Sequence, residues 1–260
     1  MEKLYIGVDV GGTFTKGGLF KNGELLERFQ VPSSKGSLDS VFAIVDKASA
    51  QGQASGIGIS MAGLVSNRRI LLNATNLGLE NIDVAGILEK KYNVPVAMEN
   101  DVSCFALAEA AASGLDDLVF LALGTGINIG VIKNGVLLGG LEYGHTFFMP
   151  SNSPCACGLS GCVEQYISGK ALQPNSKNLP NEFLTNLSIV LLNIANSYRP
   201  QKIFIGGGLA ALVAPHIKRL NYDLKSKNYG YKNAPAVTVE ISKLSTDGAI
   251  IGAAELNQKD

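Results

Sequence analysis

The sequence predicts an α/β protein made of two domains that share one βββαβαβα plan and face each other across a cleft. Three observations lead to this fold class. The stretch 12–26 matches 124–138 without gaps, and the Gly-Thr pair, the Lys-Asn-Gly triplet and the final Leu-Leu pair are identical in both copies. Helix and strand patterns then follow each copy in the same order. With 260 residues, the chain is long enough to bury a core in each of two small domains.

Each copy of the repeat predicts a three-stranded antiparallel meander. An apolar strand leads into the Gly-Thr turn, a second strand follows, and an Asn-Gly pair connects it to a third strand. Asn-Gly supplies the two positive φ angles of a tight type I′ turn. Asn22-Gly23 and Asn134-Gly135 therefore mark two hairpins.

Hydrophobic periodicity predicts the elements after each meander. In the first half they are helix 38–50, strand 57–60, helix 84–92, strand 94–98 and helix 102–112. In the second half they are helix 182–197, strand 203–205, helix 209–220, strand 237–241 and helix 248–256. The predicted domains are 1–113 and 114–246, the second with a zinc loop at 142–164, and the last helix, within 247–260, packs back on the first domain. This plan resembles the ribonuclease H-like domains of actin, Hsp70 and hexokinase.

Composition excludes several classes of partner. Lys+Arg and Asp+Glu number 22 each, so the chain lacks the basic excess that binding to nucleic acid or to an anionic membrane requires. No apolar run approaches the ~18 residues of a membrane span, and the N-terminal residues do not have the order of a signal peptide. We therefore expect a cytoplasmic protein that binds a small molecule.

Three glycine-rich turns predict a nucleotide site. Glycines let the main chain approach phosphates, and a carboxylate beside them can hold Mg²⁺ directly or through water. The first turn offers Asp9, Gly11, Gly12 and Thr13, with Lys16 after it. The second offers Thr125 and Gly126, and the third, which opens a helix, offers Gly207 and Gly208. Leu121 is the repeat equivalent of Asp9. The first half is therefore expected to bind the metal ion and the second half mainly to bind phosphate.

A cluster of cysteines predicts a structural zinc ion. His145, Cys155, Cys157 and Cys162 provide one imidazole and three thiolates, which fill a tetrahedral site and leave no open position for water. A redox dithiol, the alternative, would more often have Cys-x-x-Cys spacing. The loop also carries Glu142 and Glu164, which we interpret as acceptors for sugar hydroxyl groups; the alternative is that both are simply solvated acids.

The segment Glu99-Asn100-Asp101 follows a buried strand and begins a helix. Asp101 could be the helix N-cap. The carboxyl end of a strand facing a cleft is, however, where α/β folds place their chemistry, and phosphoryl transfer to an alcohol needs a base. We therefore assign Asp101 as general base, with Asn100 orienting a neighbouring hydroxyl group.

Together these motifs resemble the ROK (repressor, open reading frame, kinase) family of sugar kinases, glucokinases among them. The resemblance also includes the Glu-Tyr-Gly-His segment at 142–145 and the closing segment 247–254. It implies ATP and Mg²⁺ as cofactors, Asp101 as base, sugar contacts from Asn100, Glu142, His145 and Glu164, and Gly63 and Asn76 in the sugar pocket. It also implies a homodimer.

Three departures from the family pattern limit what the resemblance implies. Ala62-Gly63 replaces Pro-Gly, and Leu79-Glu80 stands where an aromatic residue is common. A short polar link at 173–181 replaces a longer helical insertion, which bears on the adenine pocket, the sugar lid and the dimer surface.

The leading hypothesis for function is transfer of phosphate from ATP to the 6-hydroxyl of glucose or a close relative. An N-acetylmannosamine or N-acetylglucosamine kinase is the alternative within the same class. From another class, a sugar-responsive repressor would carry a helix-turn-helix domain ahead of the first strand, whereas eight residues precede Asp9 here. A sugar-sensing protein without catalysis would need neither Asp9 and Lys16 nor Asp101.

Overall fold

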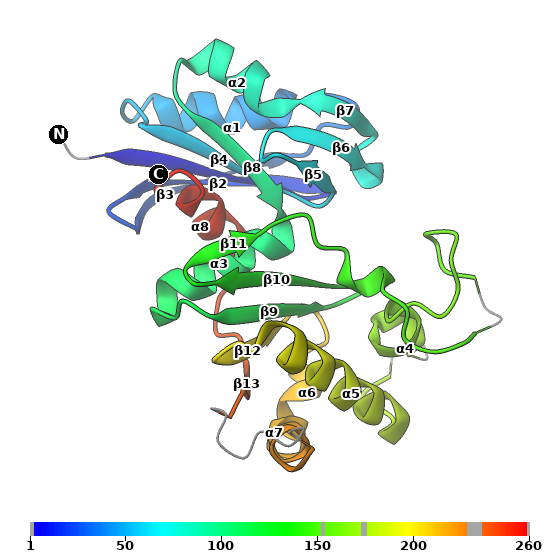
Figure 1. Ribbon diagram of the computed structural model, residues 1–260. Coiled ribbons are helices and arrows are strands. Elements are labelled where there is room, and N and C mark those ends of the chain that lie inside the picture. The colour runs from blue at the N-terminus through cyan, green and yellow to red at the C-terminus, as the bar shows by residue number, and fades with distance from the viewer. Residues whose placement is uncertain (1–2, 152–153, 173–175, 228–235, 259–260) are drawn as a thin grey trace. The chain divides into compact units, whose positions relative to one another are not determined.

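The computed structural model describes residues 3–151, 154–172, 176–227 and 236–258. The chain divides into two compact units (Figure 1). Unit 1 contains residues 1–112 and 244–260, and unit 2 contains residues 113–243. Each unit has its own hydrophobic core.

Unit 1 is built on a five-stranded sheet of order β3-β2-β1-β4-β8. Its antiparallel meander consists of β1 (Leu4–Val10), β2 (Phe14–Lys21) and β3 (Glu24–Pro32). The strands β4 (Gly56–Met61) and β8 (Val96–Asn100) add to it in parallel. All six residues of β4 are buried, as expected for a parallel strand with neighbours on both sides.

Helices α1 (Asp39–Ser49), α2 (Val84–Tyr92) and α3 (Asp101–Ser113) agree with the sequence prediction to within about two residues. Unit 1 also contains a small sheet that was not predicted. It consists of β5 (Leu64–Ser66), β6 (Ile70–Ala74) and β7 (Leu79–Asp83), with the 3₁₀ turn η1 (Thr75–Leu77) between β6 and β7. Its hairpin turn uses Asn67 and Arg68 at φ 53° and 56°. Asn67 favours a positive φ, but arginine is uncommon there, so this pair lacks the Asn-Gly signal of the other hairpins.

Unit 2 repeats the plan of the main sheet, with strand order β11-β10-β9-β12-β13. These strands are β9 (Leu118–Leu123), β10 (Ile127–Lys133), β11 (Val136–Leu138), β12 (Lys202–Gly206) and β13 (Thr238–Ile241). Its helices are α4 (Glu164–Ile167), α5 (Asn181–Tyr198), α6 (Ala210–Val213) and α7 (Ile217–Ser226). The polar link at 173–181 lies partly outside the described residues, at 173–175.

The single helix predicted over 209–220 is wrong. The chain instead forms α6 and α7, separated by the 3₁₀ turn η4 (Ala214–His216). Pro215 lies in this turn, where its missing N–H and its ring prevent a continuous α-helix.

Both predicted hairpins are confirmed. Asn22 and Gly23 have φ angles of 50° and 80°, and Asn134 and Gly135 have 51° and 73°, as a type I′ turn requires. The predicted fold class is therefore present in both units, with the unpredicted small sheet inserted into the first. Among the described residues, no helix has the length and apolar character needed to cross a membrane.

The last helix, α8 (Gly248–Glu255), belongs to unit 1 and packs on β1 and β4 (Figure 1). The approach is so close that it requires glycine. A Cβ atom on Gly7 would collide with the main-chain oxygen of Ile250, and one on Gly58 would collide with that of Ala253. The helix thus covers one face of the sheet, and Ile250 and Ala254 are buried against Tyr5 and Phe20.

We predict that Gly58→Ala destabilises unit 1. The new methyl group cannot be placed without moving α8 off the sheet, because the atom it meets is main-chain oxygen. Overpacking of this kind lowers the free energy of unfolding by roughly 1 to 3 kcal/mol. Urea denaturation measures the change. Gly12→Ala is the matched control, since nothing lies within 4 Å of its Cβ position; equal losses in both variants would contradict the packing argument.

Candidate functional site

The polar residues of unit 1 gather where β1 and its neighbours end. Asp9 on β1 lies opposite Lys16 on β2 and opposite Ser60 on β4. The Ser60 hydroxyl donates a hydrogen bond to Asp9 Oδ1 over 2.8 Å. The turn after β1 leaves Gly12 and Thr13 exposed, and the Ser33 hydroxyl fixes it by donating to the Gly11 carbonyl oxygen over 2.6 Å. The carboxylate and the exposed turn are thus held side by side.

The Asp9 carboxyl group is mostly withdrawn from solvent, and burial raises its pKa from 3.8 to about 6. The hydrogen bond from Ser60 opposes this rise, and so does the positive charge of Lys16. The neighbouring Asp101 carboxylate pushes the pKa further up. Two acids close enough to influence each other therefore lie at this edge of unit 1, a suitable place for a divalent cation.

Asn100 and Asp101 are positioned by the junction of β8 and α3. The Asn100 side chain accepts a hydrogen bond from the Val102 N–H over 2.9 Å and donates one to the Gly63 carbonyl oxygen over 3.0 Å. Asn100 therefore occupies the N-cap, and Asp101 is the first residue of the helix. Asp101 Oδ1 also accepts from the Val102 N–H, and burial raises the pKa of its carboxyl group. Such a carboxylate is a better proton acceptor than an exposed one.

The structure brings Gly63 against Asn100, as a shared pocket would need. Asn76 lies exposed in η1. Glu99 is buried at the end of β8, where it pairs with Ser60 in the parallel register.

In unit 2, the second and third glycine turns lie together. The parallel pairing of β9 with β12 puts Gly206 opposite Ala122. The Leu209 N–H donates to the Leu123 carbonyl oxygen over 2.9 Å, and Gly208 N lies 3.9 Å from the Cβ position of Gly124. Thr125, Gly207 and Gly208 are exposed, so one surface of unit 2 presents both turns to a ligand.

The four predicted zinc ligands converge in unit 2. Their donor atoms all lie within 4.8 Å of one another. Cys155 Sγ is 3.6 Å from His145 Nδ1, and Cys157 Sγ is 3.6 Å from Cys162 Sγ. Bonds of about 2.3 Å to a tetrahedral zinc ion separate sulfur ligands by roughly 3.8 Å, so the four groups fit that metal.

The loop around these ligands is closed by its own backbone. Gly158 and Gly161 have φ angles of 88° and 76°, which only glycine adopts without strain. The Gln165 side chain accepts hydrogen bonds from the Gly161 and Cys162 N–H groups over 2.7 and 3.1 Å. The wrap of the chain that the two glycines were expected to allow is therefore present.

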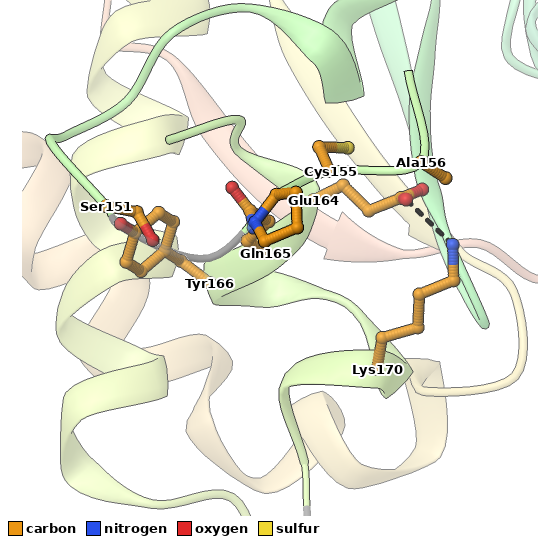
Figure 2. Close-up of a pocket in the computed structure, with 8 residues that line it drawn as sticks. Ser151, Cys155, Ala156, Glu164, Gln165, Tyr166 and Lys170 are labelled. Carbon is orange, nitrogen blue, oxygen red and sulfur yellow. Dashed lines mark hydrogen bonds and ion pairs between the residues drawn. The ribbon is translucent and has the colours of Figure 1, made fainter. Parts of the chain in front are cut away.

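Glu142 and Glu164 lie in different environments. Glu142 is exposed beside the 3₁₀ turn η2 (Tyr143–His145), and the Asn128 side chain fixes the main chain on either side of it. Glu164 is 9% exposed at the start of α4. Its carboxylate pairs with Lys170 over 2.8 Å at the edge of a cavity of about 510 Å³ (Figure 2).

Sequence reasoning did not identify Ser60, Asn128 or Lys170. Ser60 ends a predicted strand beside the Asp9 strand, so its position at the carboxyl end was a usable signal. Asn128 and Lys170 act through contacts that no spacing rule describes.

The chain matches the ROK family over residues 5–183 and 173–260. A glucokinase from Halalkalibacterium halodurans is 24% identical over 311 aligned positions, which cover 96% of this chain and 94% of that protein. The alignment is longer than this chain, so the relative contains segments that are missing here. A xylose repressor from Bacillus subtilis is 29% identical over 67% of this chain and 53% of its own length. An N-acetylmannosamine kinase from Haemophilus influenzae is 26% identical over 96% of this chain and 93% of its own length.

Among solved structures, a Streptomyces griseus ROK family glucokinase in complex with glucose and AMPPNP is similar over 99% of this chain and 100% of that chain. The TM-score is 0.78 and the sequence identity is 25%. The similarity confirms the predicted α/β fold over both units.

We predict that Asp9→Asn stabilises the protein in a pH-dependent way when no ligand is bound. Because burial raises the pKa of Asp9 to about 6, ionising it costs stability as the pH rises from 3.8 through 6. Asparagine removes that cost and still accepts the Ser60 hydrogen bond. The variant should gain up to about 3 kcal/mol above pH 6 and almost nothing below pH 4.

Thermal unfolding at pH 4 and pH 7.5 measures this effect. Asp117→Asn is the matched control of opposite sign, because the hydrogen bond from Lys133 lowers the pKa of Asp117. Asp117→Asn should lose stability at pH 7.5. A gain for Asp9→Asn that is equal at both pH values would show that burial of the charge is not its cause.

Proposed function

We propose that this chain, which belongs to the ROK family, transfers the terminal phosphoryl group of ATP to the 6-hydroxyl of glucose or a closely related hexose. Its relatives and structural neighbours support sugar phosphorylation as its activity, and the chain is a sugar kinase. The observation that carries the assignment is the edge of unit 1. There Asp101, a half-buried carboxylate with a raised pKa, lies near Asp9, the carboxylate that precedes the exposed glycine turn.

In this proposal each residue of that edge has one role. Asp101 accepts the proton of the attacking hydroxyl group, and its raised pKa makes it a suitable base. Asn100 is fixed as the helix N-cap. It orients the sugar through the side-chain amide N–H that does not bond to Gly63. Asp9 holds Mg²⁺, which when bound neutralises charge on the donor phosphates. Gly63 and Asn76 border the sugar.

The phosphate chain is proposed to contact the glycine turns. In unit 1 these contacts come from Gly11, Gly12, Thr13 and Lys16. In unit 2 they come from Thr125, Gly126, Gly207 and Gly208, whose turns lie side by side. Exposed main-chain N–H groups at such turns suit anionic oxygen atoms. Glu142, His145 and Glu164 are proposed to contact the sugar.

The acceptor has a second candidate. An N-acetylmannosamine or N-acetylglucosamine kinase is favoured by the match to the Haemophilus influenzae enzyme over 96% of this chain. A sugar-sensing role without catalysis is the candidate from another class, given the xylose repressor among the relatives. Cytoplasmic location and a homodimer stay predictions.

The experiment that tests the proposal is an ADP-release assay with ATP and Mg²⁺ across glucose, mannose, fructose, allose, N-acetylmannosamine and N-acetylglucosamine. Fastest turnover with glucose supports the leading candidate, and fastest turnover with an acetylated sugar supports the second. Sugar binding without turnover of any of them would overturn the kinase assignment in favour of sensing.

We predict that Asp101→Asn lowers kcat by about 10² to 10⁴, because the attacking hydroxyl loses its base. The dissociation constant for the sugar should change by less than about threefold, since asparagine has nearly the same size and no proton is transferred on binding. Steady-state kinetics and calorimetric sugar titration check both numbers. Asp39→Asn, at the start of α1, is the control and should retain full turnover. Normal kcat in Asp101→Asn would remove this residue from the mechanism.

We further propose that His145, Cys155, Cys157 and Cys162 hold one zinc ion that has a structural role. Elemental analysis should find one zinc per chain. Cys157→Ser should lose the metal and raise the KM for the sugar, because His145 and both ends of the loop would no longer be fixed. Ser160→Ala alters the same loop without removing a ligand and should keep the zinc. Wild-type protein without zinc, prepared in the absence of chelators, would contradict the site.

A further inference from the structure

One ion pair of unit 2 has no role in the reaction as described so far. Lys170 Nζ lies 2.8 Å from Glu164 Oε1 (Figure 2). The lysine side chain is 53% exposed, whereas the Glu164 side chain is only 12% exposed. A half-exposed ammonium group thus covers a nearly buried carboxylate.

Both partners of this pair are attached to the second glycine turn. Gly169, next to Lys170, donates its N–H to the Gly124 carbonyl oxygen over 2.7 Å. The other carboxylate oxygen, Glu164 Oε2, lies 2.5 Å from the Cβ position of Gly126. The Ser168 hydroxyl accepts the Lys170 N–H over 3.2 Å and fixes the lysine backbone. The ion pair therefore lies directly beside the Gly124–Gly126 turn.

This arrangement creates an electrostatic difficulty for a phosphate site. Glu164 places a negative charge against the turn that is proposed to receive the anionic phosphates of ATP. Repulsion between like charges is strong where water is largely excluded, as it is around Glu164. The turn itself offers a hydroxyl and main-chain groups, none of which carries a full positive charge. Lys170 Nζ is the cation that the structure pairs with this carboxylate.

We propose that Lys170 is a positioning residue for the donor nucleotide, which acts by neutralising Glu164 beside the phosphate turn. The pair allows one carboxylate to serve the sugar while the adjacent turn accepts phosphate. This inference rests on the proposed function, since it requires both ligands. It goes beyond that function in assigning Lys170, through Glu164, to the affinity for nucleotide.

The test is a double-mutant cycle that measures binding of AMPPNP with Mg²⁺ by calorimetry, together with the KM for ATP. Lys170→Met should weaken nucleotide binding by at least about tenfold, because it leaves the Glu164 charge uncompensated. Lys170→Arg should restore binding to within about threefold of wild type, because arginine also pairs with a carboxylate. Lys170→Met combined with Glu164→Gln should bind nucleotide as Glu164→Gln alone does, because no charge remains to be neutralised.

Lys133→Met is the matched control. Lys133 also pairs with a carboxylate of unit 2, Asp117 over 2.9 Å, but Asp117 precedes β9, whereas the glycine turn follows it. This variant should bind nucleotide as wild type does. Unchanged affinity in Lys170→Met would overturn the inference. So would a defect that persists in the double variant, because Lys170 would then act on the phosphates or the fold and not through Glu164.

These failures are distinguishable from failure of the proposed function. If wild-type protein neither binds AMPPNP nor releases ADP with any hexose, the kinase assignment fails. If wild type does both and the cycle shows no coupling between Lys170 and Glu164, only the role of Lys170 fails.

Discussion

The parallel pairing of β1, β4 and β8 is the constraint on which the chemistry of unit 1 depends. It puts Asp9 beside Ser60, and Met61 beside Asn100, so three strands deliver polar groups to the same edge of one sheet. A shift of one residue in either pairing would turn these side chains to the opposite face. The register is maintained from behind by α8, whose backbone contacts positions on β1 and β4 where only glycine fits. Packing at the back of the sheet thus fixes the geometry at its edge.

The main sheet of unit 2 has the same strand order as that of unit 1 but carries different groups at its strand ends. Leu121 lies where the repeat would place an acid, so β9 leads into its glycine turn without the carboxylate that β1 has in Asp9. The two acids of the candidate site in unit 2, Glu142 and Glu164, lie instead in the loop where four potential metal ligands converge and where Gln165 accepts hydrogen bonds from the main chain. A charge brought in by an insertion needs local compensation, and Lys170 provides it for Glu164. The two units can therefore differ in charge while their main sheets keep the same strand order.

Local signals decided what the sequence could predict. Asn-Gly pairs located both hairpins, and apolar periodicity located the main strands, because these features depend on neighbouring residues alone. The Asn67-Arg68 turn was not predicted because arginine rarely adopts a positive φ. At Pro215 the apolar pattern predicted one continuous helix, but the missing N–H of the proline interrupts it. The cluster of His145, Cys155, Cys157 and Cys162 was predictable because three thiols and an imidazole at this spacing are unusual. The position of Ser60 at the end of a strand was a usable signal, but its hydrogen bond to Asp9 joins residues 51 positions apart, and only the fold shows it.

Burial of carboxylates at the edge of unit 1 links stability to ligand binding. Burial raises the pKa of both Asp9 and Asp101, and the Asp101 carboxylate raises the pKa of Asp9 further. Ionising these carboxyl groups therefore costs the free protein stability as the pH rises towards neutral, the pH at which the proposed base and the proposed metal ligand act. A bound divalent cation would remove much of this cost, and any ligand that binds only the folded state raises its stability by mass action. In the proposed mechanism, the same burial therefore raises the basicity of Asp101 and favours the binding of a metal–nucleotide complex at this edge.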